Sequence, residues 1–460
     1  MNPPTNKLLK FKPYPNCILI AIAGFPALFF YYFISKTAFN LPVNDDYSLL
    51  NFTNHFSELN GWLPKLNYII NFQHNEYKLV FVNAIFAIQY ELLGHIDWVS
   101  LCMVGSTFVI IIYILISRVF KITSSNGSVR LLTLLPIGLL LFQMQYASNL
   151  NFSMAGIQNI SVLAFAMAAI SLLPHNSTIC FAGACISLLF AICASGNGFL
   201  VIPVGTLLLI ERKRWAHIFI WIILSAGIAL VYFTNYRINY SPGNSDDNLL
   251  IKILSQINLI YILSFIGSSV AKYQNHFPSV VFGILLLSVW VVAVKNKYSS
   301  KNPSIFYFVV FLILTAIAVS TIRSSLGVEQ SLASRYRIYS NLIIILTYIF
   351  LMESYFDKIK NKKIQFGILS FSIAFSAIFF VLSNTAGYRF LQGRQLAVTH
   401  EMMIWKSEVL HENIEFNDQN KNQFDPAVTR QLELGIYKPN TSVLLESIRL
   451  GVYKPPEFSK

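Results

Sequence analysis

Charged residues are scarce in this chain of 460 residues. Asp, Glu, Lys and Arg make up 12% of it, whereas soluble domains carry about 25%. Hydrophobic residues make up 55%, and the mean hydropathy is +0.56. This composition excludes a set of ordinary soluble domains and predicts an all-α polytopic membrane protein.

The few charges are unbalanced, with 34 Lys and Arg against 21 Asp and Glu, which gives a net charge of +13. The basic residues form no contiguous face with interleaved aromatics, so the pattern excludes a nucleic-acid partner. Their positions are typical of cytoplasmic loops and of sites for anionic membrane lipid.

Several catalytic and redox motifs are missing. The chain has no Walker A loop, no dinucleotide glycine pattern and no Gly-x-Ser-x-Gly elbow, which argues against nucleotide chemistry in the cytoplasm. Its five cysteines form no Cys-x-x-Cys pair, so they indicate small apolar core residues. No cleavage site follows the first apolar run, and Lys7, Lys10 and Lys12 precede it. We therefore expect a retained first helix with a cytoplasmic N-terminus.

A bilayer crossing needs about 20 mostly apolar residues, and thirteen runs approach this length. They lie near 17–35, 79–93, 98–118, 131–144, 156–173, 179–194, 197–210, 216–234, 250–270, 279–294, 304–321, 338–353 and 365–383. Basic clusters favour the cytoplasm, so an even number of crossings should separate one basic cluster from the next. Two runs are predicted to be partial helices: the short run 79–93, with Asn83, Gln89 and Glu91, and the run 250–270, with Lys252, Gln256 and Asn258. About eleven crossings remain, with the N-terminus inside and the C-terminus outside.

This topology predicts a transmembrane domain over 1–383 and two large outer regions. The first is the loop 36–78, and the second is a small helical tail over 384–460. In the tail, the segment 434–439 (Leu-Gly-Ile-Tyr-Lys-Pro) recurs at 450–455 with Val for Ile. Each copy should end a short helix, because Gly suits a left-handed cap and Pro stops a helix.

An acidic pair, Asp45 and Asp46, follows the first helix by about ten residues. Adjacent carboxylates raise one another's pKa, so their placement needs a compensating role. One would be a general base, and another a ligand for a divalent cation. The alternative is an Asx-rich turn that caps the following helix.

Two further polar clusters are predicted on the outer side. Farther along the first loop, 73–78 reads Gln-His-Asn-Glu-Tyr-Lys and offers His74, Glu76 and Lys78, either for substrate contact or as an interfacial anchor. The segment 323–337 lies between two crossings. The candidates in it are Arg323, Glu329, Gln330, Arg335, Tyr336 and Arg337.

Arginines on the outer face contradict the positive-inside tendency, which favours a role in binding phosphate oxygens with their planar forks over simple snorkelling. Asn149 and Gln158 lie in a further outer segment. Their amides pair with hydroxyl groups in either direction, as a sugar requires, although tight turns would explain them too.

These three motifs, taken with the topology, resemble the GT-C superfamily of polytopic glycosyltransferases that use polyprenyl-phosphate sugars. The residues that carry the resemblance are Asp45 and Asp46, the segment 74–78 (His-Asn-Glu-Tyr-Lys), and the segment 333–336 (Ala-Ser-Arg-Tyr). More closely, the set is similar to that of bacterial serotype-converting O-antigen glucosyltransferases. Where those relatives show His-Asn-Glu-His-Arg, this chain has Tyr77 and Lys78.

The resemblance implies that Asp45 or Asp46 is the catalytic carboxylate and that Arg335, with Arg337 or Arg323, contacts the lipid phosphate. It implies an inverting transfer of a hexose, with glucose expected, from a polyprenyl phosphate to a lipid-linked O-antigen or another surface glycan. The site would face the periplasm from the bacterial inner membrane. No cofactor is required, and Asp45 and Asp46 would hold Mg or Mn if one is used.

Two other functions share this topology. A glycan polymerase or ligase would also use outer arginines, but on a pyrophosphate-linked donor. A transporter or lipid-linked glycan flippase calls for ionisable residues deep within crossings, or for paired broken helices, and the sequence shows neither clearly.

Overall fold

The computed structural model describes residues 17–121, 127–237, 257–271, 275–411 and 426–458. Within these ranges the chain is helical and contains no strand, as the composition predicts. An isolated β-bridge joins His74 and Tyr77.

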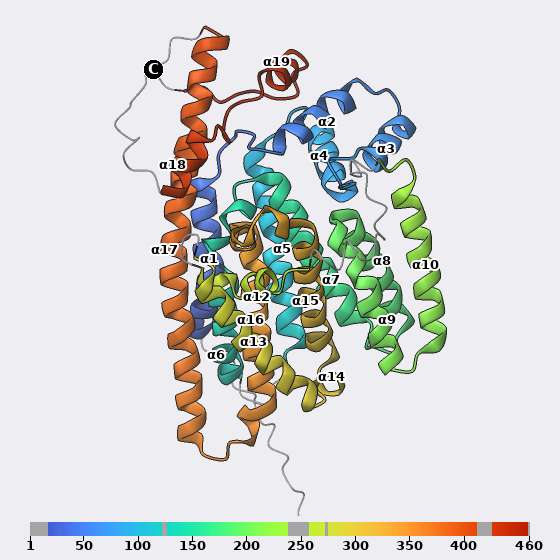
Figure 1. The fold of residues 1–460 in the computed structure, drawn as a ribbon, viewed down its shortest axis with the longest axis vertical. Helices are drawn as coiled ribbons and strands as arrows, with labels where there is room; N and C mark the ends of the chain where they lie inside the picture. Colours follow the sequence, from blue (N-terminus) through green and yellow to red (C-terminus); the bar gives the residue numbers. More distant parts are fainter. Residues whose placement is uncertain (1–16, 122–126, 238–256, 272–274, 412–425, 459–460) are drawn as a thin grey trace, which may run out of the picture.

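Eight helices are long and apolar enough to cross a membrane. They are α1 (Cys17–Thr37), α5 (Trp98–Val119), α7 (Ser153–Leu172), α10 (Trp215–Phe233), α13 (Phe277–Lys295), α15 (Pro303–Arg323), α16 (Arg337–Tyr355) and α17 (Lys362–Val409). They pack side by side, with α7 and α16 the most deeply enclosed (Figure 1). Together they confirm the prediction of a multi-pass membrane protein.

Shorter helices account for the remaining apolar runs. They are α4 (Val80–Leu93), α6 (Gly127–Leu141), α8 (Thr178–Ala194), η2 (Gly196–Leu200) with α9 (Val201–Glu211), and α12 (Leu259–Ile266). The run 79–93 is thus a helix of 14 residues, and the run 250–270 holds one of 8 residues, with 250–256 outside the described residues. Both fall short of a full span, so the total of eleven crossings stays a prediction.

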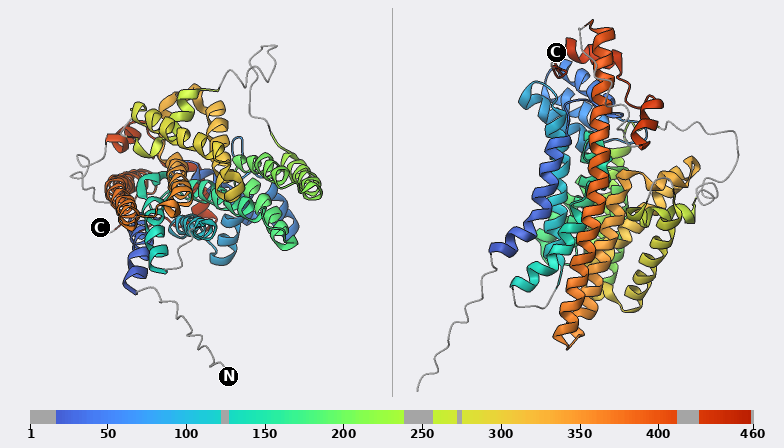
Figure 2. Two further views of the ribbon diagram at one scale, coloured as in Figure 1. Left: turned by 90° about the horizontal axis from the view of Figure 1, so that it is seen from below. Right: turned by 90° about the vertical axis from the view of Figure 1, so that its left-hand side faces the viewer.

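The two ends of the bundle differ (Figures 1 and 2). One end, here called the loop end, carries α2 (Asp46–Glu58), α3 (Trp62–Asn71) and the tail helices α18 (Pro426–Glu433) and α19 (Thr441–Arg449). The opposite, basic end carries the α9–α10 connection, α14 (Tyr298–Lys301) and the turn before α17, which contains η7 (Phe356–Lys358). Residues 7–12 of the N-terminal basic cluster lie outside the described residues.

The helix α17 is 48 residues long, roughly 72 Å at 1.5 Å per residue, and it leaves the bundle without a break (Figure 2). The predicted boundary at 383/384 therefore lies inside one helix, because hydropathy falls there while nothing in the backbone stops the helix. The tail repeats end α18 and α19 at Gly435 and Gly451, whose φ angles are +65° and +69°. This confirms the predicted left-handed caps.

Short 3-10 segments connect several of the helices. Besides η2 and η7 they are η1 (Met144–Asn149), η3 (Ser268–Val270), η4 (Ser324–Leu326), η5 (Val328–Leu332) and η6 (Ser334–Tyr336). The segment η1 packs closely on α17, where a Cβ atom on Gly387 would lie 2.4 Å from the Met144 carbonyl carbon. Only glycine allows this approach.

We predict that Gly387→Ala lowers the stability of the protein by about 1–3 kcal/mol, because backbone atoms of Met144 cannot yield to a methyl group. The matched control is Gly367→Ala on the same helix, where nothing lies within 4 Å. That change should be neutral or stabilise by up to about 1 kcal/mol through helix propensity. Thermal unfolding in detergent measures both, and shifts of the same sign would contradict the prediction.

Candidate active site

The acidic pair lies at the start of α2, and its two carboxylates face different surroundings. Asp46 is buried and accepts hydrogen bonds from the backbone N–H groups of Val43 at 3.2 Å and Met154 at 3.0 Å. Asp45 occupies the N-cap position, yet its side chain makes no capping hydrogen bond. The side chain of Asp45 is half exposed and lies 3.6 Å from Nε2 of His74. The capping interpretation therefore does not describe Asp45, whose carboxylate faces His74.

The segment from Gln73 to Lys78 folds into a tight turn that presents His74. The backbones of His74 and Tyr77 exchange two hydrogen bonds of 2.9 Å, and Asn75 takes a positive φ of 49° between them. Nδ1 of the His74 ring lies 2.8 Å from the Ser48 hydroxyl, and Nε2 lies 3.0 Å from the Asn75 amide. The ring is thus held from both sides next to Asp45.

The arginine-bearing segment η6 is fixed by hydrogen bonds to η1. The hydroxyls of Ser148 and Ser334 lie 2.6 Å apart, and Asn149 donates to the carbonyl oxygen of Arg335 at 3.0 Å. The amide oxygen of Asn149 accepts a hydrogen bond from the side-chain amide of Asn159 at 3.0 Å. Asn149 is fully buried, so it positions Arg335 and is not exposed to a ligand.

A cavity of about 310 Å³ joins the three predicted clusters. Seven of the residues proposed from the sequence line it: Asp45, His74, Glu76, Gln158, Arg323, Arg335 and Tyr336. They come from the first loop, from α7, and from the ends of α15 and η6, which are far apart in the sequence. The sequence-based hypothesis places both aspartates and the three arginines at one cavity. The lining contains one of the aspartates, Asp45, and two of the arginines, Arg323 and Arg335.

Electrostatic interactions connect the two sides of this cavity. The contact with His74 is the main cause that holds the pKa of Asp45 below its usual value, and the positive charges of Arg335 and Arg323 act in the same direction. Asp45 is therefore an ionised carboxylate near neutral pH. Nε of Arg335 is buried and lacks a hydrogen-bond partner among the described residues, and its guanidinium lies 5.1 Å from the Tyr336 ring centre.

The remaining predicted residues lie away from the cavity lining. Lys78 is buried, and its ammonium donates to the Thr234 carbonyl and to Asn71 Oδ1. Glu329 on η5 lies 3.7 Å from His276. Neither Gln330 nor Arg337 is part of the lining, and the same holds for Asn149 and Asp46.

Burial raises the pKa of Asp46 to about 7, although its backbone hydrogen bonds and the nearby Arg394 act in the opposite direction. Both of its oxygen atoms accept backbone hydrogen bonds. Among the described residues, no group of three or more His, Cys, Asp and Glu side chains is arranged to hold a metal ion.

Further polar residues of the lining include Asn159, Ser195, Asn197 and Tyr339. The amide of Asn197 donates to the Tyr339 hydroxyl at 3.2 Å, and Gln158 donates to Ser195 at 3.2 Å. The segment 195–198 is recognisable in the sequence as a polar turn between apolar runs. Tyr339 carries no such mark, because it belongs to the apolar start of α16.

Comparisons of this chain with protein-family models, with curated proteins and with solved structures found no match. The functional argument therefore depends on the residues of the cavity itself.

We predict that Asp46→Asn destabilises the protein by about 1–3 kcal/mol, since the amide nitrogen cannot accept the hydrogen bond that one carboxylate oxygen now accepts. Asp45→Asn is the matched control, because its half-exposed side chain accepts no backbone hydrogen bond. Thermal unfolding of the two variants in one detergent should separate them. Equal midpoints would show that the Asp46 carboxylate does not anchor the loop.

Proposed function

We propose that the protein is an inverting membrane glycosyltransferase with a GT-C-like fold, which moves a hexose from a polyprenyl phosphate to a surface glycan or its lipid-linked precursor. The observation that carries this proposal is the single cavity that holds an ionised carboxylate, an adjacent imidazole and two guanidinium groups. Amides of Gln158, Asn159 and Asn197 line the same space, and amides match the hydroxyls of a sugar.

In this reaction Asp45 takes the proton from the acceptor hydroxyl as its oxygen forms a bond to the anomeric carbon. The bond from that carbon to the phosphate oxygen breaks, and the polyprenyl phosphate leaves with the electron pair. The displacement inverts the anomeric centre. His74 orients the carboxylate, which is ionised near neutral pH and can therefore accept a proton.

Arg335 and Arg323 bind the phosphate that leaves. The phosphate gains negative charge as the anomeric bond breaks, so guanidinium groups directed at it bind more strongly in the transition state than before it. The unpaired Nε of Arg335 has a hydrogen bond to offer without giving up a protein partner. Since the departing group is a monophosphate, a divalent cation such as Mg or Mn is optional.

The orientation is part of the proposal. The cavity lining comes largely from the loop end, and the basic clusters lie at the opposite end (Figure 1). With the basic end in the cytoplasm, as the positive-inside rule favours, the cavity opens outward. We propose eleven crossings in the bacterial inner membrane, an N-terminus in the cytoplasm, and the tail in the periplasm.

Asp45→Asn should reduce glycosyl transfer by about 100- to 10,000-fold, the range typical for loss of a general base. The protein should still insert and unfold at the wild-type temperature. Transfer of radiolabelled sugar from polyprenyl-phosphate hexose to membrane glycan measures the rate, and Glu58→Gln on α2, an exposed carboxylate outside the cavity, is the control. Wild-type transfer by Asp45→Asn would remove the catalytic assignment.

Arg335→Ala should weaken binding of the donor lipid about 10- to 100-fold, because charge-assisted hydrogen bonds to the phosphate are lost. Arg335→Lys should restore only part of the affinity, since an ammonium lacks the planar fork. Equilibrium binding of polyprenyl phosphate to protein in detergent measures the effect. The control is Arg449→Ala, which removes an arginine of the tail that pairs with Glu446. Donor affinity unchanged in Arg335→Ala would contradict the phosphate role.

A further inference from the structure

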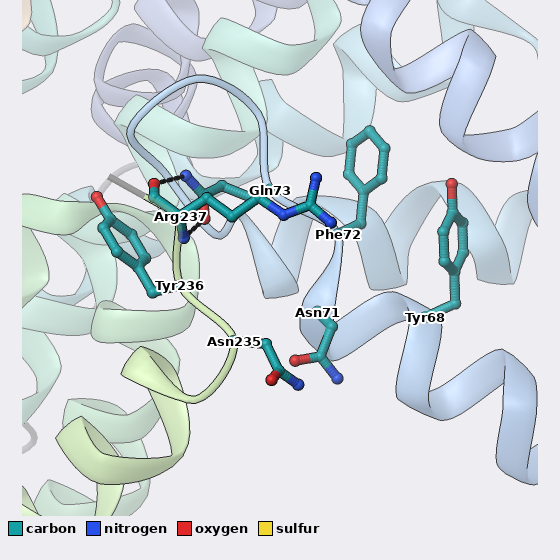
Figure 3. A pocket seen from close by; sticks show the side chains of 7 residues that line it. All are labelled: Tyr68, Asn71, Phe72, Gln73, Asn235, Tyr236 and Arg237. Atoms are coloured by element: carbon teal, nitrogen blue, oxygen red, sulfur yellow. Dashed lines mark hydrogen bonds between the residues drawn. The ribbon is translucent and has the colours of Figure 1, made fainter. Parts of the chain in front are cut away.

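A second and larger cavity lies at the loop end, beside the first one. Its volume is about 770 Å³, and it is lined by Tyr68, Asn71, Phe72, Gln73, Asn235, Tyr236 and Arg237 (Figure 3). These residues come from the end of α3 and from the segment that follows α10. The two cavities share no lining residue, but their linings are continuous along the chain, because Gln73 lines the larger one and His74 to Tyr77 line the smaller one.

Hydrogen bonds hold the two walls of the larger cavity together. The Gln73 side chain accepts from the backbone N–H of Arg237 at 2.9 Å and donates to its carbonyl oxygen at 2.7 Å (Figure 3). The Tyr236 hydroxyl donates to the carbonyl oxygen of Glu76 at 2.7 Å. The wall after α10 is therefore fastened to the same turn that presents His74.

The buried Lys78 completes this fastening. Its backbone N–H donates to the Tyr232 hydroxyl at 3.1 Å, and its ammonium bridges the Thr234 carbonyl and Asn71 Oδ1. The cavity is thus preformed in the protein alone. These hydrogen bonds also explain why Lys78, although predicted as a binding residue, does not line the smaller cavity. Its side chain joins α3 to the end of α10 instead.

The side chains that remain available in the larger cavity suit a carbohydrate. Tyr68, Phe72 and Tyr236 contribute aromatic rings to the lining, and such rings combine an apolar body with a polar edge. The Tyr236 hydroxyl already donates to Glu76, so the Tyr68 hydroxyl is the one offered to a ligand. The Asn235 amide is exposed, and the Arg237 guanidinium makes no hydrogen bond within the described residues. Figure 3 shows the Asn71 and Asn235 amides facing each other below the Arg237 side chain. Amides and guanidinium groups bind ring hydroxyls, and the aromatic faces cover the apolar side of a sugar.

The volumes of the two cavities indicate which substrate each one can hold. Ligand pockets span about 300–1,000 Å³, so the smaller cavity, at about 310 Å³, suits one sugar with its phosphate. The larger cavity, at about 770 Å³, has room for several sugar units. Its described lining residues are aromatic and amide side chains with one guanidinium, Arg237, and include no carboxylate.

From this geometry we infer that the larger cavity is a glycan-binding site that holds the acceptor, with its reactive hydroxyl reaching over the turn at 73–77 toward Asp45. The identification of the bound glycan as the acceptor rests on the proposed function. The binding site itself rests on the cavity and its side chains.

The test measures glycan binding without any donor. The probe is the mixture of oligosaccharides released by mild acid from the surface glycans of the producing cells, and the readout is saturation-transfer NMR on the full chain in a detergent without sugar. The double variant Asn235→Ala with Arg237→Gln should bind at least about tenfold more weakly, because it loses hydrogen bonds to the ligand, one of them charge-assisted. Arg212→Gln at the basic end is the matched control, and it should bind like wild type.

Equal binding by the double variant and wild type, or no binding by wild type, would overturn the inference. In a transfer assay, the double variant should raise the KM for the glycan while donor binding stays unchanged. If Asp45→Asn abolishes transfer and the double variant leaves the glycan KM unaltered, only the assignment of the larger cavity fails. If Asp45→Asn transfers normally while glycan binding is lost in the double variant, the proposed function fails and the binding site stands.

Discussion

A buried carboxylate, Asp46, connects the first loop to the centre of the bundle, and the geometry of the cavity depends on this contact. Its oxygens accept from Val43 within the loop and from Met154 at the beginning of α7. A carboxylate held in this way cannot turn, so the preceding residue cannot turn freely either. Asp45 is directed toward His74 because its neighbour is fixed.

The helix α7 is the common reference for both sides of the cavity. Its first turn binds Asp46, and one to two turns later Gln158 and Asn159 line the space between the loop and the arginines. Asn159 also donates to Asn149, which in turn holds the backbone of Arg335. Because α7 is enclosed over most of its length, it provides a rigid support of the kind that a catalytic geometry needs.

The sequence was sufficient for several long helices and for seven residues of the cavity lining, but not for the division of roles among the predicted residues. Apolar runs predicted α5, α10 and α13 to within two residues at either end, because hydropathy and length determine a spanning helix. The sequence could not show that Asp45 lines the cavity while Asp46 is buried, since two adjacent residues of one type cannot be told apart until their tertiary contacts are known. The same limit applies to Asn149 and Lys78, whose polar groups bind backbone atoms across 186 and 156 residues of chain. The resemblance to a glycosyltransferase superfamily and the number of crossings remain predictions.

The C-terminal tail contributes to the cavity without lining it. Arg394 lies on the part of α17 that extends beyond the predicted boundary at 383, is buried, and donates to Asn151 at 3.2 Å. The Asn44 amide fits its neighbours when its oxygen faces Arg394 and its nitrogen faces Ile436. In this orientation the oxygen accepts from Arg394 at 3.3 Å, and the nitrogen donates to the carbonyl of Ile436, within the first tail repeat, at 3.2 Å.

The second repeat makes an equivalent attachment, because the Tyr453 hydroxyl donates to the carbonyl of Asn40 at 2.8 Å. The tail thus binds the first loop at several points, among them Asn40 and Asn44. Arg394 in addition places a positive charge near the buried Asp46, which partly offsets the burial that raises the pKa of that carboxyl. A buried charge without such compensation is costly. The extension of α17 therefore supplies, through Arg394, the positive charge that the buried Asp46 carboxylate requires. The orientation of Asp45 therefore depends on residues about 350 positions farther along the chain.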